Sequence, residues 1–168
     1  MTTQHEQAIA RAAQDAGFNS SLTNLLVAQA KVETGNFSSA VFNTCNNAYG
    51  YIFVGQKNAT ACSRKQGSND GGANYAAYNN VYDSATEVCN WIKRNVPNYN
   101  SITTTAQYAT ALKNSKVGSY FSEPASNYAA SLAIYYKNIV VNNPIKATLI
   151  FVGIFAAISG VLYFKSKN

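Results

Sequence analysis

Apolar residues at helical spacing predict a series of short helices before residue 142. The clearest pattern runs from Ser21 to Val32 and predicts a helix that stops at Thr34-Gly35, with Glu33 at its end. Pro124, which follows a Ser at position 122, predicts the start of a last helix. Capping boxes, in which a Ser or Thr precedes a Glu or Gln by three residues, predict three other helix starts. These boxes are Thr3 with Glu6, Ser84 with Glu87 and Thr104 with Gln107.

Between the second predicted helix and Ser84 the pattern is typical of short strands. Residues 49–54 are rich in β-prone side chains and predict one strand, and residues 75–82 predict another. Residues 55–72 are rich in Gly, Asn, Ser and Lys and end in the turn signal Asn69-Asp70-Gly71-Gly72, so we expect a loop or the tip of a hairpin. The sequence therefore predicts an α+β fold that is mostly helical and has a small β lobe.

The composition of the chain changes after residue 141. Residues 147–164 contain no charge, and a helix of this length crosses the hydrocarbon core of a membrane. Lys146 and Lys165 flank the segment, and Tyr163 stands where interfacial aromatic residues collect. We expect a folded domain over residues 1–141, a linker over 142–146, a single transmembrane helix over 147–164 and a basic tail over 165–168. The alternative is a buried core helix.

Charge and composition narrow the classes of function. The chain has 168 residues, 47% of them hydrophobic, which suits one ordinary domain with a small addition. Ten of the thirteen Lys and Arg residues and all seven acids lie before Pro144, so this part carries a net charge of +3. A mildly basic domain suits an anionic polymer such as cell wall, and the sequence has no basic run that predicts nucleic-acid binding.

The cysteines and the single histidine do not form a motif. Cys45, Cys62 and Cys89 leave at least one thiol unpaired, and the sequence does not say which two, if any, form a disulfide. No Cys-x-x-Cys motif or Cys/His cluster is present, and His5 stands alone near the N-terminus, so we expect no metal and no cofactor. Residues 1–20 lack the basic start and the apolar run of a signal peptide.

Glu33 is the first candidate for chemistry. The residues before it on the predicted helix are largely apolar, and a polar loop follows it. Burial against apolar walls disfavours the charged form of a carboxyl group and raises its pKa, which a general acid near neutral pH requires. The alternative is that Glu33 only caps the helix end or faces solvent.

Three segments resemble glycoside hydrolase family 73. The first is Glu33-Thr34-Gly35, followed by Ser39 and by Asn46-Asn47-Ala48-Tyr49-Gly50. The others are residues 78–84 and residues 120–129, so the resemblance covers roughly residues 5 to 137. This family comprises lysozyme-like β-N-acetylglucosaminidases of peptidoglycan. The resemblance implies a lysozyme-like fold with a cleft between its lobes and cleavage next to N-acetylglucosamine in peptidoglycan strands.

The related lytic transglycosylases also begin their motif with Glu, Ser or Thr, and Gly. They usually continue to a turn that contains Gln, which Gly50-Tyr51-Ile52-Phe53 lacks. The sequence is therefore more similar to the glucosaminidases, with a lytic transglycosylase as the alternative. The sequence is also compatible with an inactive wall-binding module on the same fold and with a structural envelope or virion protein.

The resemblance implies the roles of two acids. Glu33 corresponds to the general acid, and Asp70 lies where the resemblance places a second carboxylate. An Asp in an Asn-Asp-Gly-Gly turn is an equally good explanation of Asp70. Asp83 and Glu87 are interpreted as caps of the helix after the β lobe. If no second carboxylate acts, the substrate's own 2-acetamido group can assist the reaction.

Five further residues in the matched segments are candidates for binding substrate. Aromatic rings stack on sugar faces and their hydroxyl groups orient an N-acetyl group, while Asn side chains bind amides or hold the loop that supports Glu33. The candidates are Asn46, Asn47, Tyr49, Tyr78 and Tyr120.

The predicted membrane helix raises a question of location. A C-terminal anchor without a signal peptide leaves the domain on the side of synthesis, away from a cell wall. A bacteriophage whose particle contains a membrane would bring such an enzyme to the host wall. The alternative is a bacterial envelope protein exported by another route.

Overall fold

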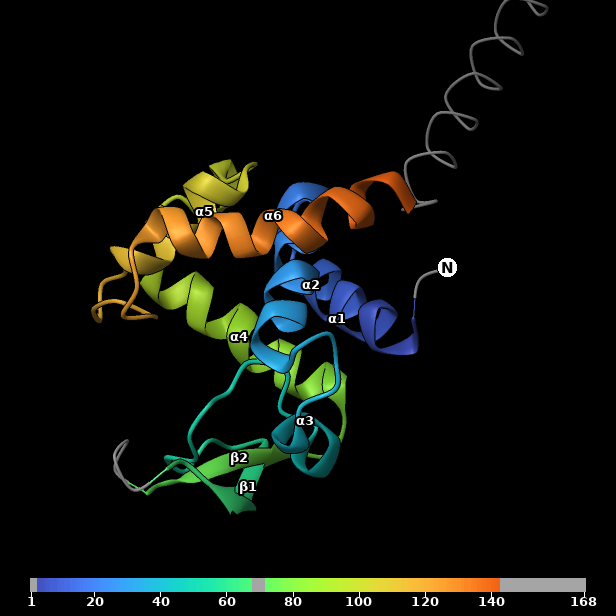
Figure 1. Cartoon of the computed structure of the whole chain (residues 1–168), viewed down its shortest axis with the longest axis vertical. Coiled ribbons are helices and arrows are strands. Elements are labelled where there is room, and N and C mark those ends of the chain that lie inside the picture. Colours follow the sequence, from blue (N-terminus) through green and yellow to red (C-terminus); the bar gives the residue numbers. More distant parts are fainter. Residues whose placement is uncertain (1–2, 68–71, 143–168) are drawn as a thin grey trace, which may run out of the picture.

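A computed structural model of the chain describes residues 3–67 and 72–142 (Figure 1). Its elements are six α-helices, a 3-10 helix and two strands within these ranges. In order they are α1 (Gln4–Asp15), α2 (Ser20–Thr34), α3 (Ala40–Cys45), β1 (Ala59–Lys65), β2 (Asn74–Tyr78), α4 (Val81–Asn95), η2 (Tyr99–Ser101), α5 (Thr105–Lys113) and α6 (Ala125–Asn142). The β lobe lies at one end of the helical part and α6 at the other (Figure 1). This arrangement confirms the prediction of a mostly helical α+β fold.

Helix α2 lies at the centre of the helical part. It packs between α1 and α6, while α4 packs on α1 and α5 on α6. Every residue from Leu22 to Ala30 is buried, including the polar Gln29, because neighbouring elements surround α2. A helix enclosed in this way holds its last turn, and therefore Glu33, in a fixed place.

The predicted capping boxes at the starts of α1 and α5 are confirmed. Thr3 and Glu6 form a capping box at α1, and Thr104 and Gln107 form one at α5. The side chain of Asn19 accepts a hydrogen bond from the backbone N–H of Leu22 at the start of α2. These starts depend on contacts within one helical turn, so they follow from local sequence.

The predicted start of α4 at Ser84 is wrong. The helix begins at Val81, and Asn80 caps it by accepting a hydrogen bond from the backbone N–H of Asp83. Ser84 is fully buried and its Oγ accepts a hydrogen bond from the N–H of Ala48. A tertiary contact therefore uses the hydroxyl group that the capping box would have needed.

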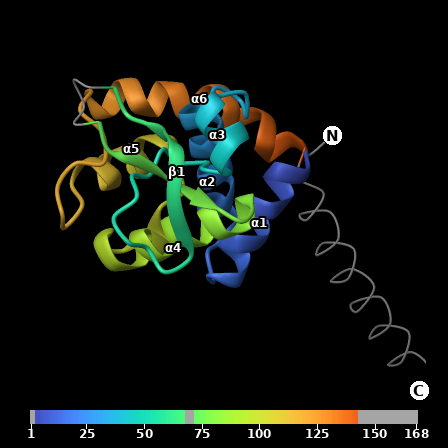
Figure 2. The same cartoon turned by 90° about the horizontal axis from the view of Figure 1, so that it is seen from below.

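The first predicted strand, residues 49–54, is also wrong. The sheet consists of β1 and β2 in antiparallel pairing, with Ala59 opposite Tyr78 and Lys65 opposite Asn74. Figure 2 shows these strands in front of the helices. Residues 49–54 reach the sheet only through an isolated bridge between Ile52 and Tyr75. Gly50 has φ +66°, a left-handed conformation that interrupts an extended strand.

No helix in residues 3–67 and 72–142 is long and apolar enough to cross a membrane. The predicted transmembrane helix (147–164), the basic tail (165–168) and residues 143–146 of the predicted linker lie outside the described residues, as does Asp70.

Candidate active site

Glu33 lies in the last turn of α2, and a tightly bonded loop follows it. Gly35, Asn36 and Phe37 all have positive φ angles, between 57° and 64°. The Thr34 hydroxyl group donates a 2.6 Å hydrogen bond to the carbonyl of Ala30 and accepts one of 2.8 Å from the N–H of Phe37. These bonds stabilise a left-handed backbone that non-glycine residues rarely adopt. The loop therefore ends α2 directly after Glu33 and fixes the position of its backbone.

A tyrosine on α6, far from Glu33 in the sequence, contacts the Glu33 carboxyl group. The Tyr128 hydroxyl donates a 2.5 Å hydrogen bond to Glu33 Oε1. Oε2 accepts no hydrogen bond from the described residues. Only 3% of Tyr128 is exposed, whereas Glu33 is half-buried, so the donor side of this bond is buried. The arrangement leaves Oε2 as the carboxyl oxygen that can carry and transfer a proton.

Buried polar groups lie behind this pair. The Tyr108 hydroxyl donates a 2.6 Å hydrogen bond to Gln29 Oε1, and both residues are fully buried. Gln29 also contributes to the environment of Tyr128, since its amide partly offsets the increase that burial and Glu33 cause in the pKa of Tyr128. The Tyr108–Gln29 hydrogen bond joins α5 to α2, while Gln29 Nε2 is buried without a hydrogen-bond partner among the described residues.

The surroundings of Glu33 favour the protonated form of its carboxyl group. Burial raises its pKa, the hydrogen bond from Tyr128 lowers it, and the negative charge of Glu123 raises it, with a net result above the ordinary value of 4.5. The structure thus gives the raised pKa that the apolar pattern around Glu33 predicts. A carboxyl group that keeps its proton to higher pH can donate it to a leaving oxygen.

A group of partly exposed aromatic rings lies close to Glu33. Phe121 stacks on Tyr128 with ring centroids 4.2 Å apart, and Tyr120 contacts Trp91 and Tyr51 edge to face at 5.4 and 6.3 Å. Burial raises the pKa of Tyr120 well above its usual value, and the charge of Glu33 adds to this increase. Partly exposed rings beside a carboxyl group provide surfaces on which sugar rings stack.

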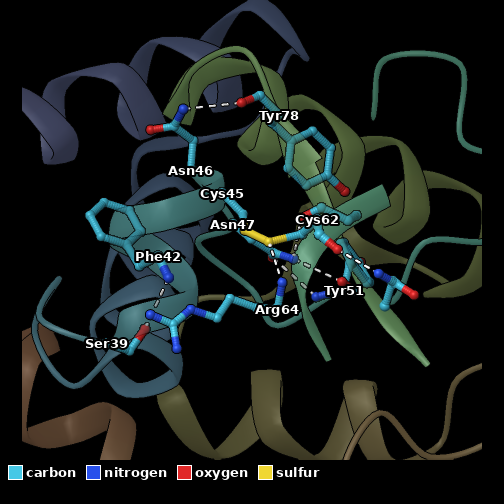
Figure 3. Close-up of a disulfide and its surroundings, with 11 residues drawn as sticks. Ser39, Phe42, Cys45, Asn46, Asn47, Tyr51, Cys62, Arg64 and Tyr78 are labelled. Atoms are coloured by element: carbon cyan, nitrogen blue, oxygen red, sulfur yellow. Dashed lines mark hydrogen bonds between the residues drawn. A yellow bond between two sulfur atoms is a disulfide. The ribbon is translucent and has the colours of Figure 1, made fainter. Parts of the chain in front are cut away.

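Asn46 and Asn47 hold the loop before the β lobe. Asn46 Nδ2 donates to the carbonyl of Tyr78 at 3.0 Å (Figure 3). Asn47 is buried, and its Nδ2 donates to the carbonyls of Tyr51 and Ala76 while Oδ1 accepts from the N–H groups of Tyr49 and Tyr51. All the hydrogen-bonding capacity of the Asn47 amide is thus directed at the backbone, which corresponds to the supporting role considered for this residue.

The three candidate tyrosines occupy different places. Only 2% of Tyr49 is exposed, and its hydroxyl contacts the carbonyl of Leu26 at 3.4 Å, so it is a core residue. Tyr78 is 4% exposed, and its hydroxyl has no hydrogen-bond partner among the described residues. Tyr120 keeps an exposed part and donates a 3.0 Å hydrogen bond to the carbonyl of Tyr49. Of these three, Tyr120 is best placed to contact a ligand.

The two acids in α4, Asp83 and Glu87, make contacts within the helix and with its cap. Asp83 accepts a hydrogen bond from Asn80 Nδ2 in the first turn of the helix, as expected for a capping residue. Glu87 lies in the second turn instead and forms an ion pair with Arg94 at 3.7 Å. No group of metal-binding side chains occurs in the part of the chain that the structure describes.

A disulfide joins Cys45 at the end of α3 to Cys62 in β1 (Figure 3). It connects α3 to the β lobe, in addition to the hydrogen bonds of Asn46 and Asn47. The thiol group of Cys89 is free and buried, and burial raises its pKa to about 12.

Sequence reasoning alone does not select Tyr128 or Phe121 for the site. Tyr128 occurs at helical spacing with Leu132, which is the pattern of an ordinary core residue. The signal that points to both is their position in the third segment that resembles family 73, residues 120–129.

The comparisons with known proteins agree with this geometry. A glucosaminidase family model, described as mannosyl-glycoprotein endo-beta-N-acetylglucosaminidase, matches residues 6–140. The chain belongs to this family. It is a glycoside hydrolase, and its substrate is a glycan. Comparisons with curated proteins and with solved structures found no match.

Proposed function

We propose that this glycoside hydrolase cleaves the glycan strands of peptidoglycan next to N-acetylglucosamine, with Glu33 as the general acid. The observation that carries the proposal is the hydrogen bond from the Tyr128 hydroxyl to Glu33 Oε1, because it orients a carboxyl group whose pKa is raised. The mildly basic domain and the aromatic rings beside Glu33 support a polymeric glycan with anionic character.

The geometry supports a specific role for each oxygen of Glu33. In the ground state Oε2 carries the proton and Oε1 accepts the hydrogen bond from Tyr128. As the proton moves to the glycosidic oxygen, negative charge develops on the carboxylate and strengthens that hydrogen bond. An interaction that is stronger in the transition state than in the ground state accelerates the reaction.

A second group must stabilise or attack the oxocarbenium-like carbon. We assign this role to Asp70, acting as a base on water, with cleavage on the reducing side of N-acetylglucosamine. Asp70→Asn is then expected to slow turnover more than Asp83→Asn, which should mainly weaken the start of α4. A neutral Asp70→Asn variant would favour assistance by the 2-acetamido group instead.

We also propose that residues 147–164 anchor the enzyme in a membrane, either that of a virion or that of a bacterial envelope. The disulfide between Cys45 and Cys62 supports a working place outside the reducing cytosol, since structural disulfides persist in oxidising compartments. Extraction of the expressed chain from membranes by detergent, but not by high salt or alkali, would test the anchor. Release by salt or alkali would contradict it.

The catalytic proposal is tested with purified peptidoglycan. Glu33→Gln fits the same space but cannot donate the proton, so the rate should fall by a factor on the order of 10²–10⁴. The matched control is Glu87→Gln, which removes a carboxylate that is paired with Arg94 on α4 and should leave the rate nearly unchanged.

The reaction products distinguish hydrolysis from transglycosylation and from binding alone. New N-acetylglucosamine reducing ends support hydrolysis, whereas 1,6-anhydro-N-acetylmuramic acid would identify a lytic transglycosylase. Binding to insoluble wall without release of sugar would identify an inactive binding module. Retention of more than about a tenth of the activity by Glu33→Gln would reject Glu33 as the acid.

A further inference from the structure

The last part of the segment between α5 and α6 contacts the site. Residues 119–124, which we name the aromatic loop, carry Tyr120, Phe121 and Glu123. Phe121 stacks on Tyr128, and Glu123 is the acid whose charge acts on Glu33. The position of this loop therefore affects both the hydrogen-bond donor to the proposed acid and the charge that it experiences.

Lys113, the last residue of α5, holds this loop. Its Nζ donates hydrogen bonds to the carbonyls of three consecutive residues, Phe121 at 3.1 Å, Ser122 at 2.9 Å and Glu123 at 2.8 Å. A lysine ammonium group has three N–H donors, so all of them are used by the loop backbone. The ammonium group also lies 5.2 Å from the centre of the Phe121 ring. Ser119 Oγ adds a further hydrogen bond to the carbonyl of Phe121.

We propose that Lys113 is a positioning residue for the glycosidase reaction, acting through the aromatic loop on the Tyr128–Glu33 pair. The inference rests on the proposed role of Glu33 as the acid. Lys113 itself is not among the groups whose charge shifts the pKa of Glu33, so its effect passes through the loop. Three hydrogen bonds from one cation to consecutive carbonyls restrict the loop to one conformation, which keeps Phe121 against Tyr128.

Movement of the aromatic loop should change the pKa of Glu33 in one direction. Among the described residues, five titratable groups interact electrostatically with Glu33. They are Tyr128 from α6, Tyr108 from α5, Tyr49 from the segment after α3, and Tyr120 and Glu123 from the aromatic loop. The four tyrosines have raised pKa values and stay neutral, so Glu123 is the ionised neighbour in this set. If the loop moves away, Glu33 loses burial and the repulsion of Glu123, and its pKa falls. Tyr128 belongs to α6 and not to the loop, so its hydrogen bond to Glu33 is expected to remain and does not offset this fall.

The experiment compares Lys113→Met, Lys113→Arg and the matched control Lys116→Met in the full-length chain. Lys116 is exposed and lies three residues away. Two quantities are measured: the pH dependence of peptidoglycan cleavage, and the titration of the Glu33 carboxyl carbon by ¹³C NMR, assigned by its absence in Glu33→Gln. The second measurement does not require activity.

For Lys113→Met we expect a loss of about tenfold or more in kcat, since a misplaced catalytic group costs up to 10²-fold. The alkaline limb of the rate profile and the Glu33 titration should both move to lower pH. Lys113→Arg keeps a cation with several donors and should restore most of both quantities, and Lys116→Met should match the unmodified enzyme. If Lys113→Met does not fold, Lys113→Gln, which retains two N–H donors, should show the same shifts at smaller size.

Each outcome separates the two proposals. A Glu33 titration and a rate profile that are unchanged in a folded Lys113→Met variant would overturn the role of Lys113, as would equal shifts in Lys116→Met. If the unmodified enzyme cleaves no faster than Glu33→Gln, the proposed function fails. In that case a shifted Glu33 titration in Lys113→Met still supports the structural coupling through the aromatic loop, and an unshifted one overturns it.

Discussion

The hydroxyl group of Tyr128 donates a 2.5 Å hydrogen bond to Glu33 Oε1, although the two residues are separated by 95 positions in the chain. The bond joins the first turn of α6 to the last turn of α2. Because Tyr128 is almost completely buried, the proton affinity of Glu33 depends on how α6 packs against α2. The site is therefore assembled by helix packing, not by the loop motif alone.

Removal of this hydroxyl should change the pH profile in a definite direction. The hydrogen bond from Tyr128 lowers the pKa of Glu33, so Tyr128→Phe should raise that pKa further. A general acid is active while protonated, and the alkaline limb of the cleavage rate should move to higher pH, opposite to the shift expected for Lys113→Met. The maximal rate should fall because the developing carboxylate loses its hydrogen bond. The control is Tyr136→Phe on the same helix, whose hydroxyl bonds to the carbonyl of Thr103. A shift to lower pH in Tyr128→Phe would contradict the assigned role.

The raised pKa of Glu33 also predicts how stability depends on pH. The folded state holds the Glu33 proton more tightly than the unfolded state, in which the pKa is close to 4.5. This contribution is fully present below pH 4.5 and is lost as the pH rises through the raised folded value. Glu33→Gln removes this loss, so the variant should be more stable than the unmodified chain near neutral pH, with a smaller difference in acid. Urea unfolding at several pH values measures this, and a Glu33→Gln variant that is less stable at neutral pH would contradict it.

Asn47 should matter mainly for stability. Asn47→Ala leaves several buried backbone groups of the loop and of β2 without a partner, and we expect a cost of about 3 kcal/mol or more in the free energy of unfolding. Asn43→Ala is the matched control, because Asn43 is exposed and its side chain donates a hydrogen bond only to the carbonyl of Ser38 among the described residues. Its cost should be below about 1 kcal/mol. Denaturant unfolding of both variants decides this, and equal costs would show that the Asn47 network is not needed.

The disulfide between Cys45 and Cys62 should stabilise the β lobe. The two cysteines are 17 residues apart, and a loop of this size gives a stabilisation of about 3 kcal/mol. The double variant Cys45→Ala, Cys62→Ala should lower the stability by that amount, and a reducing agent should then have no further effect. Cys89→Ala is the control for the free thiol. An unmodified chain that is equally stable with and without reductant would contradict the prediction.

Truncation after Asn142 should give a folded and active domain. The family match ends at residue 140, and Leu132 in α6 is the last fully buried core residue in the part of the chain that the structure describes. We expect the unfolding temperature and the peptidoglycan cleavage rate of residues 1–142 to match those of the full chain, which should itself need detergent. Size-exclusion chromatography and circular dichroism test this. Aggregation or unfolding of the truncated protein would show that the C-terminal segment belongs to the core.

Features that depend on contacts within one turn were accessible from the sequence. The capping boxes of α1 and α5 and the cap of α2 at Asn19 follow from side chains that bond to backbone groups three residues away. The end of α2 at Gly35 follows from the left-handed conformation that glycine tolerates. The place of Glu33 at the end of an apolar helix could be predicted for the same reason. The apolar pattern also indicated the direction of its pKa shift, although the burial that causes most of the shift is produced by tertiary packing.

Tertiary structure decided the features in which distant groups compete for the same bonds. Ser84 matches a capping box, but the N–H of Ala48 takes its hydroxyl group and Asn80 caps the helix instead. Strand β1 has no strand-like hydrophobic pattern that the sequence could reveal. Its pairing with β2 and its disulfide to α3 hold it in place instead. The sequence by itself determined the proposed acid and the helix that carries it. The partners of that acid, Tyr128 and the loop held by Lys113, were decided by helix packing, because residues far apart in the chain become neighbours only when α5 and α6 close around α2.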